Sequence, residues 1–192
     1  PTTLGYKPFA DKIETNDDLL AARLRQAGAI FIGHTNMPEF GLGSNTFNSV
    51  FGTTSNPYDL SKSSGGSSGG AAVALATDML PLADGSDMGG SLRNPASFCN
   101  VVGFRPSIGR MPKGLGAAWY GRLSTTGPMA KTVKDTAFLM SIISGEDKTD
   151  PLTLTQSGND FLEAFTPYEI LKDSPLKVAV SPSLGDLPVD SQ

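Results

Sequence analysis

The sequence is poor in residues that several common chemistries require. Its 192 residues include one histidine, His34, and one cysteine, Cys99, and 19 acidic side chains outnumber 15 basic ones. A single cysteine cannot form an internal disulfide, which favours a reducing compartment such as the cytoplasm. A net charge of −4 provides no basic field that could neutralise phosphates or hold an anionic membrane surface. We therefore expect neither nucleic acid nor a membrane as a partner.

Long apolar runs are also missing. No stretch approaches the ~18 residues of a spanning helix, and residues 1–5 lack the charged and apolar regions of a signal peptide. The hydrophobic content of 39% and the charged content of 18% are close to the globular average. The sequence therefore predicts a folded, soluble, cytoplasmic domain with one sizeable core.

The usual metal-ligand patterns are absent from the sequence. There is no HExxH or CxxC pattern, and one histidine with one cysteine provides too few of the usual ligands. We expect neither a metal nor an organic cofactor.

Apolar periodicity predicts alternating helices and strands. Residues 15–28 are typical of an amphipathic helix that begins at a capping Thr15 and ends at Gly28. The apolar run 29–32 that follows is typical of a buried parallel strand. Further helices are predicted at 69–79 and 132–144, and further strands at 80–83, 101–104 and 176–180. This order predicts an α/β fold, a mixed central β-sheet covered by helices on both faces.

Two features concern the organisation of the chain. Residues 36–62 have no apolar period, but Phe40, Phe47, Val50 and Phe51 are spread through them, so we expect an ordered loop packed on the core. No repeat or linker divides the sequence. Residues 181–192 trail off in turn residues, and no element precedes the first loop. We therefore expect one domain, 1–192, truncated at both ends.

Glycine is abundant, with 22 residues, and it is concentrated in two serine-containing runs at 65–70 and 85–91. Glycine allows positive φ and lets backbone N–H groups approach a ligand, and successive N–H groups can hold an anion. An apolar helix and a strand follow the first run at once, which argues against a flexible linker. No GxxxxGK[ST] pattern occurs, which argues against a phosphate cradle.

Ser91, at the end of the second run, is a candidate nucleophile. The N–H groups of Met88, Gly89, Gly90 and Ser91 are adjacent donors that could hold the oxyanion of a tetrahedral intermediate. A serine nucleophile also needs a base. His34 lies in a turn-like stretch without a serine motif and is the weaker candidate. The other options are a lysine base or a metal, and the residues present give a metal little support.

Several motifs occur together and in order along nearly the whole chain. They are GGSSGG at 65–70, GSDMGGSLR at 85–93, FCNVVGFRP at 98–106, TNMPEF at 35–40, NPYD at 56–59 and GPMAKT at 127–132. Together they resemble the signature of the amidase signature family. The resemblance implies the amidase signature fold and an amidohydrolase that cleaves a small-molecule amide to an acid and ammonia or an amine through a seryl acyl-enzyme.

The resemblance also implies roles for individual residues. In that family a serine nucleophile is activated by a second serine, held in a cis peptide, which passes the proton to a lysine. Ser91 matches the nucleophile and Ser67 the cis-serine. Gly41 would line the acyl pocket by resemblance. Supporting roles fall to Ser68, Asp87 and Arg93, while Cys99 is expected to be a small buried group.

The sequence departs from the family pattern at the lysine. Lys7, Lys12 and Lys62 do not match the lysine motif, which lies upstream of a segment like the one that starts this chain. We therefore expect the lysine to lie upstream. Two alternatives remain open at this point: an amidotransferase-type subunit that liberates ammonia for a partner, and a non-catalytic module with the same fold. The family also allows a homodimer.

Overall fold

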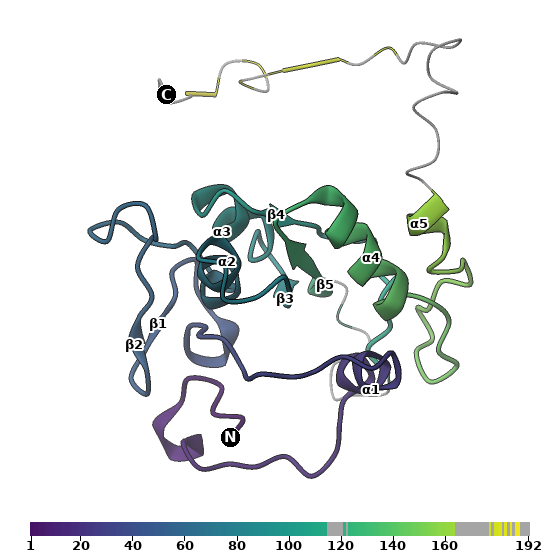
Figure 1. Ribbon diagram of the computed structural model, residues 1–192, viewed down its shortest axis with the longest axis horizontal. Coiled ribbons are helices and arrows are strands. Elements are labelled where there is room, and N and C mark those ends of the chain that lie inside the picture. The colour runs from purple at the N-terminus through teal and green to yellow at the C-terminus, as the bar shows by residue number, and fades with distance from the viewer. Residues whose placement is uncertain are drawn as a thin grey trace.

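The computed structural model describes residues 1–114, 121, 123–163, 177, 179–181, 183, 185, 187 and 188. At its centre is a three-stranded antiparallel sheet in the order β3 (Leu82–Asp87), β5 (Thr125–Ala130), β4 (Val102–Gly103). Figure 1 shows helices α2 and α3 on one side of this sheet and α4 on the other. The sheet with helices on both sides confirms the α/β prediction. The strand pairs within the described residues are all antiparallel.

The central strand, β5, was not predicted from the sequence. It contains Gly127 and Pro128, residue types that are depleted in strands. Pro128 lacks an N–H, but its carbonyl oxygen accepts a hydrogen bond from Phe104 N at 3.1 Å. A Cβ at Gly127 would stand 2.3 Å from the Phe104 carbonyl oxygen, so only glycine lets the two backbones approach this closely.

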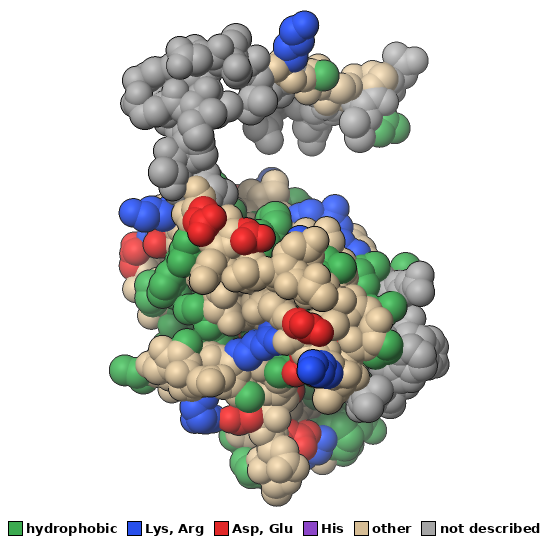
Figure 2. All heavy atoms as spheres, turned by 90° about the vertical axis from the view of Figure 1, so that its right-hand side faces the viewer, with side chains coloured by type: hydrophobic (Ala, Val, Ile, Leu, Met, Phe, Trp, Pro, Cys, Tyr) green, Lys and Arg blue, Asp and Glu red, His purple; other side chains and the backbone are tan. Residues whose placement is uncertain are grey.

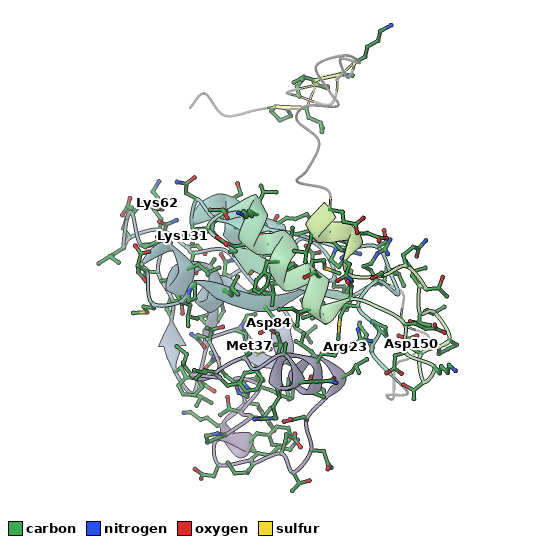
Figure 3. All side chains as sticks on the ribbon, turned by 45° about the vertical axis from the view of Figure 1, so that its right-hand side comes forward. Arg23, Met37, Lys62, Asp84, Lys131 and Asp150 are labelled. Carbon is green, nitrogen blue, oxygen red and sulfur yellow. The ribbon has the colours of Figure 1, made fainter. Side chains whose placement is uncertain are left out.

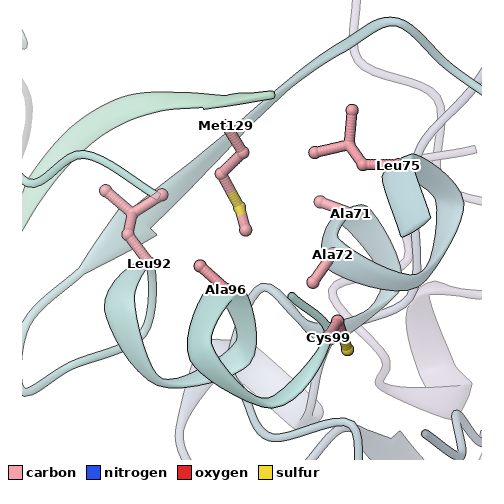
Figure 4. Packing of buried hydrophobic residues seen from close by; sticks show 7 residues of the cluster. All are labelled: Ala71, Ala72, Leu75, Leu92, Ala96, Cys99 and Met129. Atoms are coloured by element: carbon pink, nitrogen blue, oxygen red, sulfur yellow. The ribbon is translucent and has the colours of Figure 1, made fainter. Parts of the chain in front are cut away.

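One hydrophobic cluster fills the space between the sheet, α2 (Gly69–Ala76) and α3 (Arg93–Phe98). Its buried members are Ala71, Ala72, Leu75, Leu92, Ala96, Cys99 and Met129 (Figure 4). Most are small, which brings the two helices close together. Burial raises the pKa of the Cys99 thiol to about 11, so this side chain is the small buried group that the sequence predicts.

A second cluster joins the other side of the sheet to α4 (Val133–Ile143) and α1 (Leu19–Gln26). The predicted helix 132–144 is confirmed, and Thr132 Oγ1 caps it by accepting from Asp135 N at 3.0 Å. The predicted helix 15–28 is confirmed over its central part. Its cap is Asp18, whose Oδ1 accepts from Ala21 N at 2.8 Å, rather than the expected Thr15.

Arg23 connects α1 to the C-terminal end of α4 through hydrogen bonds. Its guanidinium donates to the carbonyl oxygens of Ile143 at 2.6 Å and Gly145 at 3.0 Å. Ile143 is the last residue of α4, so its carbonyl has no partner within the helix, and Gly145 follows the C-cap Ser144. A cation at this end also interacts favourably with the helix dipole.

We expect Arg23→Ala to lower the free energy of unfolding by about 1–3 kcal/mol, because each charged hydrogen bond contributes on the order of 1.5–3 kcal/mol and part of it is recovered from water. Urea denaturation of the full-length protein measures this change. The matched control is Arg25→Ala on the same helix, whose exposed pair with Asp17 at 2.7 Å is screened by solvent. Equal losses in the two variants would contradict the role of Arg23.

The predicted strand at 29–32 is wrong for the described residues. Ile30 and Ile32 are 89% and 70% exposed, and no described strand pairs with the segment. An apolar run forms a strand only where a neighbouring strand accepts its backbone hydrogen bonds. The predicted strand at 80–83 is confirmed, but β3 continues to Asp87, so the expected glycine loop begins three residues later than Gly85. The predicted strand at 101–104 is confirmed as β4. In the range 176–180 the structure describes residues 177, 179 and 180, and none of these three is in a strand.

The loop at 36–62 is ordered, but by different residues from those expected. Phe47 and Phe51 are 60% and 63% exposed, whereas the polar Thr46, Asn48 and Asn56 are buried. Asn48 Oδ1 accepts from the backbone N–H groups of two residues in the turn of the hairpin β1 (Phe47–Asn48) and β2 (Gly52–Thr53). Side-chain amides therefore hold this loop by satisfying its backbone groups.

The remaining elements are short. They are the 3-10 turns η1 (Lys7–Phe9) and η2 (Glu39–Gly41) and the helix α5 (Asp160–Glu163). Within the described part of the chain, no helix has the length and apolar character needed to cross a membrane. Acidic and basic side chains are interspersed on the face shown in Figure 2, and the described residues form no continuous basic patch there.

Candidate active site

The first serine loop is buried directly before α2. Residues 64–69 are all buried, and Ser67 is 4% exposed. The peptide bond between Gly66 and Ser67 is cis. A Cβ at Gly66 would stand 3.0 Å from the Asn45 backbone, so the loop packs tightly against the segment that precedes β1.

The second serine loop follows β3 and is organised by Asp87. This carboxylate is 0% exposed, and it accepts hydrogen bonds from Gly90 N at 2.7 Å and Leu92 N at 3.2 Å. Arg93 Nε donates to it at 3.0 Å and Arg105 Nη1 at 2.9 Å. Burial would raise the pKa of Asp87, but the hydrogen bonds from Arg93, the two backbone groups and Arg105 outweigh it and hold that pKa well below its usual range.

This arrangement gives the loop a fixed shape. A buried ionised carboxylate is tolerated only where donors satisfy it, and here two arginines and two backbone N–H groups do so. The turn at 88–91 is therefore tied to β3 by a charged centre. Asp87 and Arg93 form an ion pair beside this turn. The sequence analysis predicted a supporting role for these two residues.

The two serine loops touch. Ser68 N donates to the Ser91 carbonyl oxygen at 3.2 Å, and Ser68 Oγ donates to the Ser86 carbonyl oxygen at 3.4 Å. A Cβ at Gly85 would stand 2.4 Å from Ser68 Oγ. Ser68 therefore braces the first loop against the second. This contact holds the half-buried Ser91 beside the residue that follows Ser67 in the chain.

The predicted oxyanion donors are not equivalent. Gly90 N already donates to Asp87, whereas the N–H groups of Met88, Gly89 and Ser91 have no acceptor among the described residues. The Met88 side chain is 55% exposed. Gly41 lies in η2 with φ +71°, and the position of its Cβ would be 3.2 Å from Met37 Cε. Its link to an acyl pocket stays a prediction.

The base is the least complete part of the site. His34 is exposed, and no lysine within the described residues hydrogen-bonds to either serine loop. Lys131 pairs with Asp78 at 2.5 Å, and Lys12 pairs with Glu14. Figure 3 shows Lys62 and Lys131 at one end of the molecule, with Arg23 and Asp150 at the other.

Two residues of the site were missed by sequence reasoning. Arg105 donates to the Asp87 carboxylate and also to its carbonyl oxygen, and its second terminal nitrogen donates to the Leu123 carbonyl oxygen at 2.9 Å. Arg105 stands in the motif at 98–106, but no local pattern in that motif indicates its contact with Asp87. Thr46 hydrogen-bonds to the first serine loop, and nothing distinguishes it in a Ser/Asn/Thr-rich segment.

Comparison with known proteins agrees with the geometry. The family model described as Amidase matches residues 1–192. An acylamidase of Rhodococcus erythropolis is 42% identical over 96% of this chain and 38% of its own length. The crystal structure of a glutamyl-tRNA(Gln) amidotransferase subunit from Thermotoga maritima has a TM-score of 0.72 and 39% identity over 81% of this chain and 34% of that one.

A third relative adds a further substrate type. The structure of a 6-aminohexanoate cyclic dimer hydrolase complexed with substrate has a TM-score of 0.74 and 35% identity, and it covers 80% of this chain and 32% of that one. The fold and the paired serine loops therefore define an α/β domain of the amidase signature type. The chain belongs to the amidase signature family. It spans about a third of the length of the relatives that it matches.

Proposed function

We propose that the protein carrying this chain hydrolyses a carboxylic amide through an acyl-enzyme on Ser91. The observation that supports the proposal is the contact between the serine loops, in which Ser68 N donates to the Ser91 carbonyl oxygen, and buried Ser67 directly precedes Ser68 in the chain. A serine with a second hydroxyl at its side has a route for its proton, which an isolated serine lacks at neutral pH.

The reaction proceeds in two halves. The Ser91 hydroxyl oxygen attacks the amide carbonyl, and its proton passes to Ser67 and from there to the lysine that the family resemblance implies. The tetrahedral intermediate carries its negative charge on the former carbonyl oxygen, within reach of the Met88, Gly89 and Ser91 N–H groups. The C–N bond then breaks, and the leaving nitrogen takes up the proton. Water attacks the acyl-enzyme, and the acid leaves as Ser91 recovers its proton.

The Asp87 centre fixes the donors for this chemistry. Because the Asp87 carboxylate accepts hydrogen bonds from Gly90 N and Leu92 N, the backbone of the turn at 88–91 is held in one conformation. Donors that are already oriented stabilise developing charge without reorganisation during the reaction, and one such donor contributes about 2.7–4 kcal/mol. We assign the oxyanion role chiefly to the N–H groups of Met88, Gly89 and Ser91, because Gly90 N donates to Asp87.

A second candidate function is release of ammonia for a partner protein. The similarity to a glutamyl-tRNA(Gln) amidotransferase subunit favours this function. The net charge of −4 argues against direct tRNA binding by this chain, so a partner would have to bind the tRNA. In that case the amide substrate would be a glutamine side chain rather than an aliphatic or aromatic amide.

Ammonia release from the full-length protein distinguishes these functions. We expect turnover on at least one of acetamide, benzamide and glutamine, with glutamine alone favouring the amidotransferase function. The Ser91→Ala variant tests the site, and Ser97→Ala is the matched control because Ser97 is exposed on α3 outside the site. Turnover that survives in Ser91→Ala would contradict the proposal. A wild-type protein inert on all three amides and on an anilide would favour the non-catalytic module.

A further inference from the structure

Thr46 places a single hydroxyl inside the first serine loop. The residue is 1% exposed and lies directly before β1. Its Oγ1 donates to the Gly65 carbonyl oxygen at 2.9 Å, and the Ser67 carbonyl oxygen lies 3.4 Å away. The same oxygen accepts from Gly69 N at 3.1 Å. One side chain therefore binds the backbone on both sides of Ser67.

The packing around Thr46 leaves the hydroxyl little freedom. A Cβ at Gly69 would stand 2.2 Å from Thr46 Oγ1, so the start of α2 approaches the threonine as closely as a glycine permits. The Thr46 carbonyl oxygen accepts from Thr54 N at 2.9 Å, which fixes the threonine backbone to the hairpin. The neighbouring Asn45 backbone packs against Gly66. Residues 45 and 46 thus form a rigid support beneath the loop.

We propose that Thr46 is a positioning residue for Ser67, whose hydroxyl it aims at Ser91 by holding the loop backbone at Gly65 and Gly69. The inference rests on the proposed function. Proton transfer requires the heavy atoms to lie about 2.6–3.2 Å apart, so a small shift of this loop interrupts the relay. Thr46 is buried beneath the loop, so its removal should affect the proton relay and leave substrate binding intact.

The test compares Thr46→Val with Thr46→Ser in the full-length protein. Valine keeps the shape and removes the hydroxyl, whereas serine keeps the hydroxyl. We expect valine to lower kcat about 10- to 100-fold, the scale of a misplaced catalytic group, with KM unchanged. The rate at which a fluorophosphonate labels Ser91 should fall in parallel. Serine should restore both rates to within about threefold of wild type.

Thr136→Val is the matched control. Thr136 is also a buried threonine, 4% exposed, and its Oγ1 donates to the Thr132 carbonyl oxygen at 2.8 Å within α4, away from both serine loops. It should retain full kcat. Circular dichroism verifies that each variant is folded, and Thr46→Cys, with a weakly hydrogen-bonding thiol, replaces valine if that variant does not fold.

The outcomes separate this inference from the proposed function. An active wild type with unchanged kcat in Thr46→Val, or with an equal loss in Thr46→Val and Thr46→Ser, overturns the role of Thr46 alone. A rise in KM without a fall in kcat also overturns it, because it places Thr46 in substrate binding. A wild type that is inert and unlabelled overturns the proposed function and the role of Thr46 with it.

Discussion

Replacing Ser91 with alanine is expected to reduce kcat for amide hydrolysis by at least about 10³-fold, because loss of one member of a nucleophile relay removes most of its catalytic effect. Alanine keeps the backbone and removes one half-buried hydroxyl, so the fold should be unaffected. Ser67→Ala should cause a loss on a similar scale, since the nucleophile and its relay act as a unit. Steady-state kinetics on the preferred amide measure both losses.

The double variant sharpens this prediction. If Ser91 and Ser67 act as one unit, Ser91→Ala/Ser67→Ala should be no slower than the worse single variant. If the two serines contributed independently, the fold-losses in kcat of the two single variants would instead multiply in the double variant. Strictly multiplicative losses, or a Ser67→Ala variant with wild-type kcat, would contradict a proton relay between the two serines.

Replacing Asp87 with asparagine should cause the largest loss of stability in the site. The side chain is 0% exposed, and asparagine would leave Arg93 and Arg105 without their counter-charge. Removing one partner of a buried ion pair costs about 3–5 kcal/mol, and we expect the lower end because both arginines reach solvent. That is a large part of the roughly 5–15 kcal/mol that stabilises a typical domain.

Urea denaturation of the full-length protein measures this loss, and Asp78→Asn is the control. Asp78 also pairs with a cation, Lys131, but its side chain is 81% exposed, so the unfolding midpoint should hardly move. The Asp87 variant should also lose kcat, because the turn that carries Met88 and Gly89 would no longer be fixed. Equal midpoints for the two variants would contradict the account of the Asp87 centre.

The depressed pKa of Asp87 makes a prediction about pH. Because the folded pKa lies below the unfolded value of about 3.9, the carboxylate contributes its full stability above that value. The contribution is lost as pH falls from about 5 towards the folded pKa, where the native state also takes up the proton. The free energy of unfolding should fall less steeply over this range in Asp87→Asn than in wild type. If the free energy of unfolding depended on pH equally steeply in wild type and Asp87→Asn, this prediction would be wrong.

Sequence periodicity was sufficient for the helices that carry their own signals. α1 and α4 have an apolar face and a capping side chain, α2 is a run of small apolar residues, and each of the three overlaps its predicted range. α3 was missed because it is short and contains Pro95. β5 was missed because Gly127 and Pro128 are residue types that argue against a strand. Glycine is needed at 127 because the Phe104 backbone approaches it closely, and the local sequence does not reveal this tertiary contact. The strand at 29–32 was wrong because strand formation depends on a partner.

The candidate site divides in the same way. Ser67, Ser91 and Asp87 stand in motifs that can be recognised from the sequence, and the structure brings their loops together. Thr46 and Arg105 make contacts with residues 18 or more positions away along the chain, and no local pattern reveals such contacts. The occupied N–H of Gly90 could not be foreseen either, because it depends on where the Asp87 carboxylate turns.

The most direct test of the central claim is to map the residue that a fluorophosphonate labels in the full-length protein. The account predicts that peptide mass spectrometry finds the phosphonate on Ser91, that Ser91→Ala is unlabelled, and that Ser67→Ala is labelled much more slowly. A label on Ser67, on Ser97 or on no serine while the protein turns over amides would contradict the assignment of Ser91 as the nucleophile.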